Sequence, residues 1–149
     1  MAANSKREQI IISDFNLVQA VPSIKSPIRT LPEYAELTCY AQTQFPVCAV
    51  VGRMPVPNEK FSQRGVAVDQ IRSEIKVDIF VYLQVNEDAD SLISSVADDL
   101  FKQLYTDESR GKLVYETTIK IKEKVNIWNP FVAFQMTAIH KYIHDTGGI

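Results

Sequence analysis

Residues 73–85 read SEIKVDIFVYLQV, and this alternating segment decides the fold. Side chains along a β-strand point alternately to its two faces, so one face here is aliphatic and the other is charged and then aromatic. The aliphatic face consists of Ile75, Val77, Ile79, Val81 and Leu83, and the other of Glu74, Lys76, Asp78, Phe80 and Tyr82. The pattern predicts a long strand that buries one face and carries a candidate contact surface on the other.

A helix and two further strands follow this segment. Apolar residues between 89 and 104 recur at steps of three and one, which is typical of one helix face; they are Ala89, Leu92, Ile93, Val96, Ala97, Leu100, Phe101 and Leu104. Gly111 lies in a predicted turn and can adopt a positive φ. Residues 113–127 and 131–143 alternate again, around a turn at Asn129-Pro130. This order predicts an α+β protein with a mostly antiparallel sheet of about four to five strands and helices packed on one face.

The N-terminal third predicts the remaining elements. Helical spacing of Ile11, Phe15 and Val18 indicates a helix from residue 6 to about 21, with a short strand at residues 10–12 as the alternative. Residues 23–29 are expected to be extended, and Pro27 favours an edge or loop position there.

A second helix and a buried strand are predicted next. Thr30 can cap a helix start, and Pro32 and Glu33 suit its first turn, so a helix is expected from there to about residue 43. Residues 44–52 read QFPVCAVVG and are apolar on both faces, which predicts a central buried strand.

Length and composition favour one domain spanning residues 1–149. The net charge of −2 argues against a dominant nucleic-acid or anionic-membrane surface, which needs clustered excess Lys and Arg. No apolar run is long enough to cross a bilayer, and the start of the chain lacks the apolar core of a signal peptide. Cys39 and Cys48 fit a reducing compartment, and Cys48 is expected in the core.

Residues 55–68, PVPNEKFSQRGVAV, are expected to form a long loop or mobile hairpin that contacts a partner. Phe61 is an aromatic side chain flanked by charges, an arrangement that often anchors interfaces. The predicted contact residues here are Glu59, Lys60, Phe61 and Arg64. Residues 144–149 are expected to form a flexible tail.

A search for catalytic and metal-binding motifs favours no catalytic residue, metal or cofactor. His140 and His144 are four apart, which would suit a zinc pair on a helix but separates them by roughly 13 Å on a strand. Asp98 and Asp99 diverge by about 100° on a helix, so they are expected to face solvent. The two histidines are therefore expected to have packing roles, and the two aspartates are expected to face solvent.

Two further features are candidates for binding. Lys120, Lys122 and Lys124 share one strand face and could meet phosphates, although such a stripe more often faces solvent or pairs with acids. The expected neighbours across the sheet are Asp78, Lys76 and Glu74. Trp128 is expected to be a packing or subunit anchor rather than a ligand stacker.

Taken together, these features resemble the tail terminator family of long-tailed bacteriophages, the lambda-type tail completion proteins. The resemblance covers residues 44–142 and rests on the order QFPVCAVVG, a long loop, SEIKVDIFVYLQV, a helix ending LFKQLYTDESRGKLVYET, and NPFVAFQMTAIHKY. The most similar details are the Leu104-Tyr-Thr-Asp turn, Gly111 and Pro130. The turn Asp-Glu-Ser-Arg-Gly is longer than the tight Leu-Gly-Gly type of the family.

The resemblance implies a structural virion protein, not an enzyme. It would form a homohexameric ring on the head-proximal end of the tail tube, stop tube polymerisation and dock a head-completion or neck protein. DNA would only pass through the lumen, with no specific binding and no membrane contact. The protein would reside in the virion tail or neck, and in the host cytoplasm during assembly. The outward-face candidates for the ring interface are Phe80, Tyr82, Phe131 and Ile139, with Trp128 as an anchor.

Alternatives from other classes remain open at this point. Another head–tail joining protein or a tail-tube subunit would use a related sheet-and-helix subunit. A single-strand nucleic-acid module would need exposed aromatic side chains beside basic ones, and Phe80 and Tyr82 near Lys120 and Lys122 are the feature in its favour. A small α+β enzyme would need a nucleophile and a base that converge, and the sequence offers no such pair.

Overall fold

Two long antiparallel strands form the centre of the sheet. The computed structural model describes residues 5–62, 69–84, 89–122, 125–128 and 131–145. Strands β4 (Asp69–Gln84) and β7 (Phe131–Asp145) stay in register from the pair Gln70–Asp145 to the pair Gln84–Phe131. Residues 73–84 of the alternating segment therefore form most of β4, and the predicted last strand is β7.

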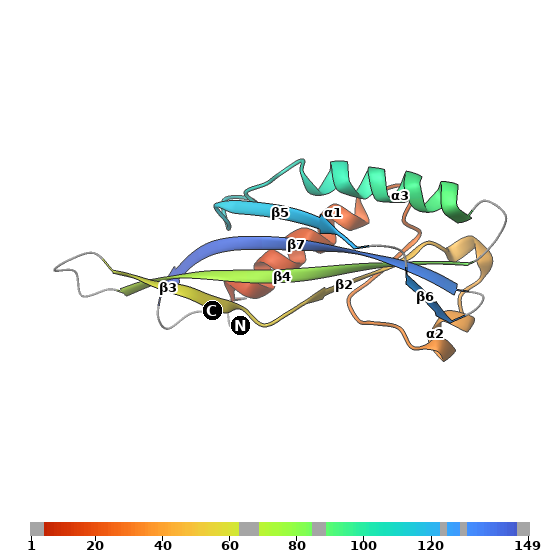
Figure 1. The fold of residues 1–149 in the computed structure, drawn as a ribbon, viewed down its shortest axis with the longest axis horizontal. Helices are drawn as coiled ribbons and strands as arrows, with labels where there is room; N and C mark the ends of the chain where they lie inside the picture. The colour runs from red at the N-terminus through yellow and green to blue at the C-terminus, as the bar shows by residue number, and fades with distance from the viewer. Residues whose placement is uncertain (1–4, 63–68, 85–88, 123–124, 129–130, 146–149) are drawn as a thin grey trace.

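The other elements surround this pair (Figure 1). The helices are α1 (Lys6–Gln19), α2 (Tyr34–Thr38) and α3 (Ala89–Leu104), with a 3-10 turn η1 (Gln42–Gln44); the strands are β1 (Ser26–Ile28), β2 (Val47–Gly52), β3 (Val56–Ser62), β5 (Glu116–Ile121) and β6 (Val125–Trp128). Across the described residues the sheet has seven strands in the order β1-β2-β4-β7-β5, with β3 beside β4 and β6 beside β7. The β1–β2 pair is parallel and the remaining pairs are antiparallel. This confirms the mostly antiparallel α+β prediction, with more strands than expected.

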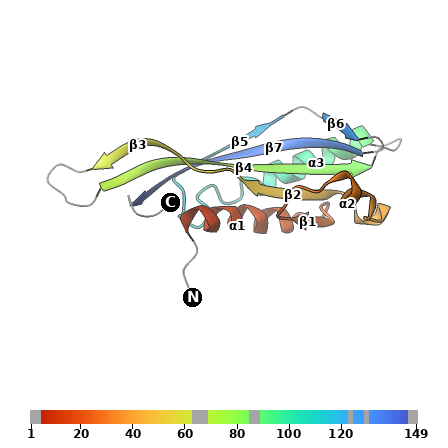
Figure 2. The same ribbon diagram turned by 90° about the horizontal axis from the view of Figure 1, so that it is seen from below.

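The larger hydrophobic core lies between one face of the sheet and helices α1 and α3. All five aliphatic side chains predicted to be buried on β4 are fully buried, and so are Val96, Leu100 and Leu104 of α3. Figure 2 shows α1 lying along one side of the strands. Burial of each large apolar side chain contributes roughly 1.5–3 kcal/mol before entropy is subtracted. The alternating strand pattern therefore predicted this layer correctly. The helix stripe did so for Val96, Leu100 and Leu104, whereas Leu92 and Phe101 of the same stripe are 37% and 36% exposed.

A second, smaller core covers the opposite face at one end of the sheet. It contains Leu37 of α2 with Val47, Ala49, Tyr82, Phe131 and Ala133. In Figure 1, α3 lies above this end of the strands and α2 lies below it. The two longer helices, α1 and α3, pack on one face as predicted, whereas the short α2 lies on the other because the chain between β1 and β2 folds back over the aromatic face.

Several element boundaries differ from the sequence prediction. Helix α1 and the edge strand β1 agree with it, and the alternative strand at residues 10–12 does not form. Helix α2 starts after Glu33 instead of Thr30 and ends at Thr38. Thr38 and Cys39 have low helix propensity, and the Thr38 hydroxyl donates to the carbonyl oxygen of Ala35 at 2.7 Å. This early end leaves room for the separate turn η1.

The predicted strand over residues 113–127 forms as two strands. Ile121 pairs with Met136, whereas Val125 pairs with Ala133, so four steps along this segment match three along β7. One extra residue on one side shifts the register, and a one-residue shift exchanges the two faces of a strand. The single alternation predicted from Tyr115 to Ile127 is therefore interrupted.

The last predicted boundary is also corrected. Strand β7 continues to Asp145, so His144 belongs to the sheet and not to a tail starting at residue 144. His144 is buried, and its Nε2 lies 2.6 Å from the Ser73 hydroxyl. This contact satisfies both polar side chains at the end of the sheet.

Candidate functional site

The predicted partner segment forms much of a hairpin arm, defined as β3 with residues 69–74 of β4. Strand β3 pairs with β4 from Val56 opposite Glu74 to Ser62 opposite Asp69. In Figure 1 this arm extends past the ends of α1 and α3. The hairpin interpretation of residues 55–68 thus holds for residues 56–62, whereas a long loop does not form there.

The predicted contact residues of the arm are only partly described. Glu59, Lys60 and Phe61 lie on β3, but their side chains fall outside the described part of the structure, as does the whole of Arg64. Their role in partner contact stays a prediction.

Three aromatic residues predicted on an open outer face lie instead in the second core. Tyr82 and Phe131 are 6% and 3% exposed, and Phe80 is half-buried against the same cluster. The rings of Phe45 and Phe131 stack with centroids 5.7 Å apart. Because Leu37 of α2 and Phe45 pack against this cluster, Tyr82 and Phe131 stabilise the subunit and are not available as an outer surface. Trp128 lies on β6, and its side chain is outside the described part.

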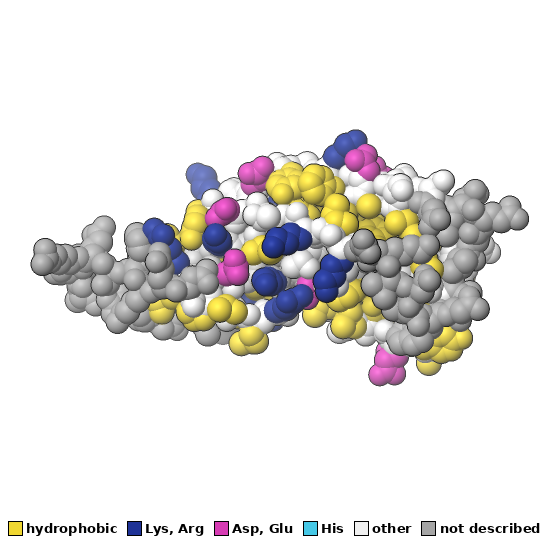
Figure 3. Space-filling view, viewed as in Figure 1, with side chains coloured by type: hydrophobic (Ala, Val, Ile, Leu, Met, Phe, Trp, Pro, Cys, Tyr) yellow, Lys and Arg dark blue, Asp and Glu magenta, His cyan; other side chains and the backbone are white. Residues whose placement is uncertain are grey.

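A groove with a positive lining remains open on the outer face of the sheet. We call it the basic groove; it has a volume of about 330 Å³ and is lined by Arg53, Lys76, Lys120, Ile121, Lys122, Thr137 and Ile139. Figure 3 shows Lys and Arg side chains gathered in the middle of this face. Two members of the predicted lysine stripe thus lie beside cations of β4 and the end of β2, a combination that the sequence did not reveal.

One carboxylate at the basic groove is shared among several donors. Arg53 donates to Asp78 through Nε at 2.6 Å and through Nη2 at 2.9 Å. The amide of Gln135 and the hydroxyl of Thr137 also donate to Asp78, each at 2.9 Å. Burial raises the pKa of Asp78, but the bonds and charge of Arg53 and the bonds from Thr137 and Gln135 outweigh it and lower the pKa below its ordinary value.

The three lysines of the basic groove are not paired in the same way. Within the described residues, Lys76, Lys120 and Lys122 make no side-chain hydrogen bond or ion pair, and the nearby Asp78 is occupied by Arg53. The expectation that acids across the sheet pair with the stripe is therefore not met for Lys120 and Lys122, and Lys124 is outside the described part. Four cations and one carboxylate give the groove a formal charge of +3.

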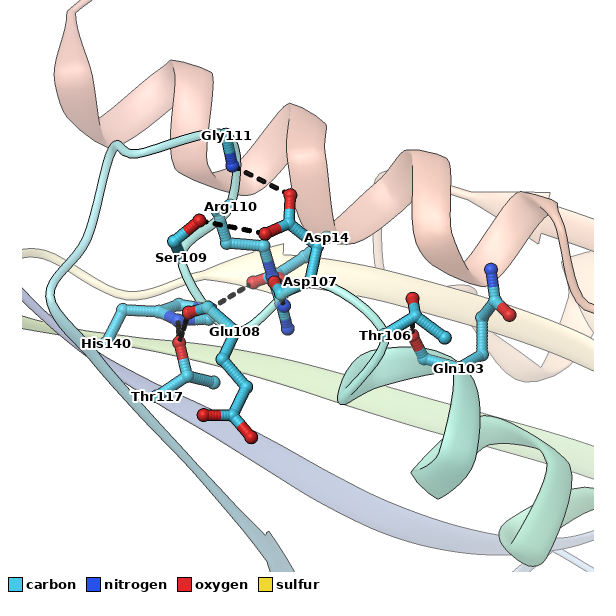
Figure 4. Close-up of polar contacts among 10 residues, drawn as sticks. All are labelled: Asp14, Gln103, Thr106, Asp107, Glu108, Ser109, Arg110, Gly111, Thr117 and His140. Atoms are coloured by element: carbon cyan, nitrogen blue, oxygen red, sulfur yellow. Dashed lines mark hydrogen bonds and ion pairs between the residues drawn. The ribbon is translucent and has the colours of Figure 1, made fainter.

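A second polar cluster is closed inside the molecule (Figure 4). Asp14 of α1 accepts from Arg110 Nε at 2.6 Å and lies 2.6 Å from His140 Nε2. His140 Nδ1 lies 2.9 Å from the Thr117 hydroxyl, and all four residues are at most 8% exposed. This buried network joins α1, the turn before β5, β5 itself and β7.

The order hydroxyl, imidazole and carboxylate in the buried network resembles a nucleophile relay, but its geometry supports a structural role. The Thr117 hydroxyl donates to the carbonyl oxygen of Glu108 at 2.6 Å and is buried, so it is not presented to a substrate. Sequence reasoning missed this network because its partners are distant in the chain. The turn itself was anticipated at Gly111, which has φ +68°, although Arg110 and Lys112 share the left-handed conformation.

Other candidate residues have local structural roles. His140 and His144 lie on strand β7 rather than on a helix, and the described residues contain no group of three or more His, Cys, Asp or Glu side chains suited to a metal. Asp98 and Asp99 are exposed, as expected; Asp98 pairs with Lys102 at 2.9 Å. Cys48 is buried, and burial raises the pKa of its thiol.

Comparison with protein-family models and with curated proteins finds no match for this chain. Among the described residues, the helices are too short or too polar to span a membrane.

Proposed function

We propose that this chain is a virion structural protein that forms a ring on the head-proximal end of a phage tail tube. The ring would stop tube polymerisation and offer a docking face to a head-completion or neck protein. A ring requires each subunit to present two different surfaces, one to each neighbour. The proposal draws on the tail-terminator-like order of elements together with two surfaces that the subunit leaves uncovered, the hairpin arm and the basic groove.

The hairpin arm is the observation that carries this proposal. It continues the central strands past the helix-covered body, and within the described residues β3 has a strand neighbour on one side. An edge strand of this kind presents backbone N–H and C=O groups that a second chain can pair with. An arm with an open edge suits a subunit that contacts a neighbour or the last ring of the tube.

A nucleic-acid module is supported less well. The basic groove supplies positive charge, but single-strand binding also needs aromatic side chains on which bases stack. Tyr82, which the sequence suggested for this role, is buried in the second core. Another head–tail joining protein remains the closest alternative, because it would use similar surfaces.

The experiment that tests the proposal removes residues 58–64 from the arm in the virus that encodes this chain. Because the described core residues lie outside this segment, circular dichroism and the melting temperature should stay close to wild type. Tails examined by negative-stain electron microscopy should have uncontrolled length or fail to join heads. Replacement of Ser94 and Ser95, exposed on α3, by alanine is the matched control and should leave tails normal.

Two results would contradict this assignment. Normal tail length and infectivity in the deletion would make the arm a passive connector. Loss of folding would make the arm part of the core.

A further inference from the structure

We infer that the basic groove of one subunit receives the acidic surface around α2 of a second copy of this chain. The acidic surface consists of Leu31, Glu33, Tyr34 and Glu36. This inference deepens the proposed function, since it rests on the ring and names the two surfaces that would meet within it.

The groove has charge that the subunit does not neutralise. Arg53 uses Asp78, whereas Lys76, Lys120 and Lys122 have no side-chain partner in the described structure. The whole chain carries −2, so a groove of +3 leaves −5 on the rest of the molecule. A second copy therefore offers a complementary, net-acidic surface.

The acidic surface matches the groove in both charge and apolar character. Residues 30–52 contain two carboxylates and no Lys, Arg or His. Glu33 and Glu36 are exposed, and neither has an ion pair within the described structure. Beside them, Leu31 and Tyr34 are 50% and 45% exposed, and Ile121 of the groove is 55% exposed. Apolar contact in the middle of such an interface would supply affinity, and the charges would orient the two surfaces.

The exposed face of α3 is a weaker candidate for the same groove. Its carboxylates already have partners: Asp98 lies 2.9 Å from Lys102, and Asp99 accepts from the Ser23 hydroxyl at 3.2 Å. Docking α3 into the groove would require these contacts to be exchanged, and Lys102 would face the groove's own cations. The surface around α2 needs no such exchange.

A protein surface also fits the groove better than a single-stranded nucleic acid. Single-strand binding relies on exposed aromatic side chains on which bases stack, and the described residues that line the groove include none. Exposed Ile121 gains nothing from a phosphate backbone, whereas an apolar side chain such as Leu31 can cover it.

The two surfaces share no residue, so the contact between them is head-to-tail. A contact of this kind leaves one free groove and one free acidic surface at the ends of any pair. Copies therefore continue to add until the rotation closes into a ring.

The test uses two charge-reversal variants of the full chain. The groove variant carries Lys120→Glu and Lys122→Glu, and the helix variant carries Glu33→Lys and Glu36→Lys. Each should raise the dissociation constant for self-association about 100-fold, measured by analytical ultracentrifugation, because like charges would then face each other. Melting temperatures should stay close to wild type, since all four side chains are exposed.

Mixing and rescue make the test specific. The groove variant keeps an intact acidic surface and the helix variant keeps an intact groove, and the two reversed surfaces are complementary to each other. An equimolar mixture should therefore associate again, with the two variants alternating, although neither variant associates alone. A chain with all four reversals should associate again, because both surfaces change sign together. This rescue also separates a lost contact from a misfolded variant.

Matched controls reverse charge elsewhere on the surface. Lys25→Glu with Lys112→Glu, and Asp98→Lys with Asp99→Lys, change exposed residues of the same types and should leave association unchanged. The inference is overturned if the groove variant associates like wild type, if only the Asp98/Asp99 variant loses association, or if wild type stays monomeric. It is also overturned if the groove reversals weaken binding of a single-stranded oligonucleotide and leave self-association intact.

These outcomes separate the contact from the proposed ring cap. Open filaments or short chains that the groove variant abolishes would support the contact and contradict the ring. Rings that persist in the groove variant would support the ring and contradict the contact.

Discussion

The buried network and the basic groove are two charged clusters of similar composition with opposite surroundings. The network places Asp14 between Arg110 and His140, and none of these side chains is appreciably exposed. The groove places Asp78 beside Arg53 but leaves three ammonium groups without partners in the described structure. The buried charges are paired, whereas exposed charges are paired in some places, such as Asp98 with Lys102, and are left without a partner in the groove.

The physical reason is the cost of taking charge out of water. A buried charge must be paired and hydrogen-bonded, or it destabilises the fold by several kcal/mol. Exposed lysines stay hydrated, so a subunit can keep them unpaired at little cost. The network therefore fixes the fold, whereas the groove remains free to bind.

The largest expected effect comes from a buried charge that has no partners. Leu100 of α3 is fully buried between the helix and the sheet, as the helix stripe predicted. Leu100→Asp should abolish soluble expression, because its carboxylate would lack the donors that Asp14 has. Leu100→Ala should remain soluble with a lower melting temperature. A soluble Leu100→Asp protein that melts cooperatively would contradict the assignment of this helix face.

The next effect comes from breaking the buried network itself. Asp14→Ala would leave Arg110 as a buried cation without its carboxylate, and this should lower the free energy of unfolding by about 3–5 kcal/mol. Chemical denaturation monitored by circular dichroism measures this change. Asp98→Ala, which removes an exposed ion pair, is the control and should cause no measurable change. An equal loss in the free energy of unfolding for both variants would contradict the claim that the buried ion pairs stabilise the fold more than the exposed ones.

A smaller, pH-dependent effect is expected from Asp78. Its pKa is lowered in the folded protein, so its contribution to stability is fully present above the ordinary value of 3.8 and is lost as the pH falls through the folded pKa. The melting temperature of wild type should therefore exceed that of Asp78→Asn near neutral pH, and the difference should shrink below pH 3.8. A difference that stays constant down to acid pH would show that the Arg53, Thr137 and Gln135 contacts do not favour the charged form.

The elements predicted best from the sequence are those in which the spacing of apolar residues matches the face that is buried. Strands β4 and β7 and helix α3 pack against a broad apolar layer, so the spacing of Ile75, Leu100 and Tyr142 already indicates their buried faces. The second core was not predicted because it depends on where the chain between β1 and β2 folds back. The aromatic end of β4 therefore looked like an open interface, although α2 covers it.

The polar clusters were harder to predict, for a related reason. Asp14 is 96 residues from Arg110 and 126 from His140, and no local pattern links them. The lysine stripe was visible, but Lys76 comes from β4 and Arg53 follows the end of β2, so the groove exists only after the sheet forms. The sequence of the hairpin arm does not alternate between apolar and polar residues, because its strands pair outside a core. The pattern that usually indicates a strand is therefore missing there.

The most direct test of the account is the solution mass of the purified wild-type chain, combined with negative-stain imaging of the same sample. The account predicts a closed ring of six subunits, built by head-to-tail contacts. Particles with six-fold symmetry and a mass of six subunits would agree with this. A two-fold symmetric dimer that does not grow with concentration would contradict it, because a self-complementary contact uses one surface where the ring requires two.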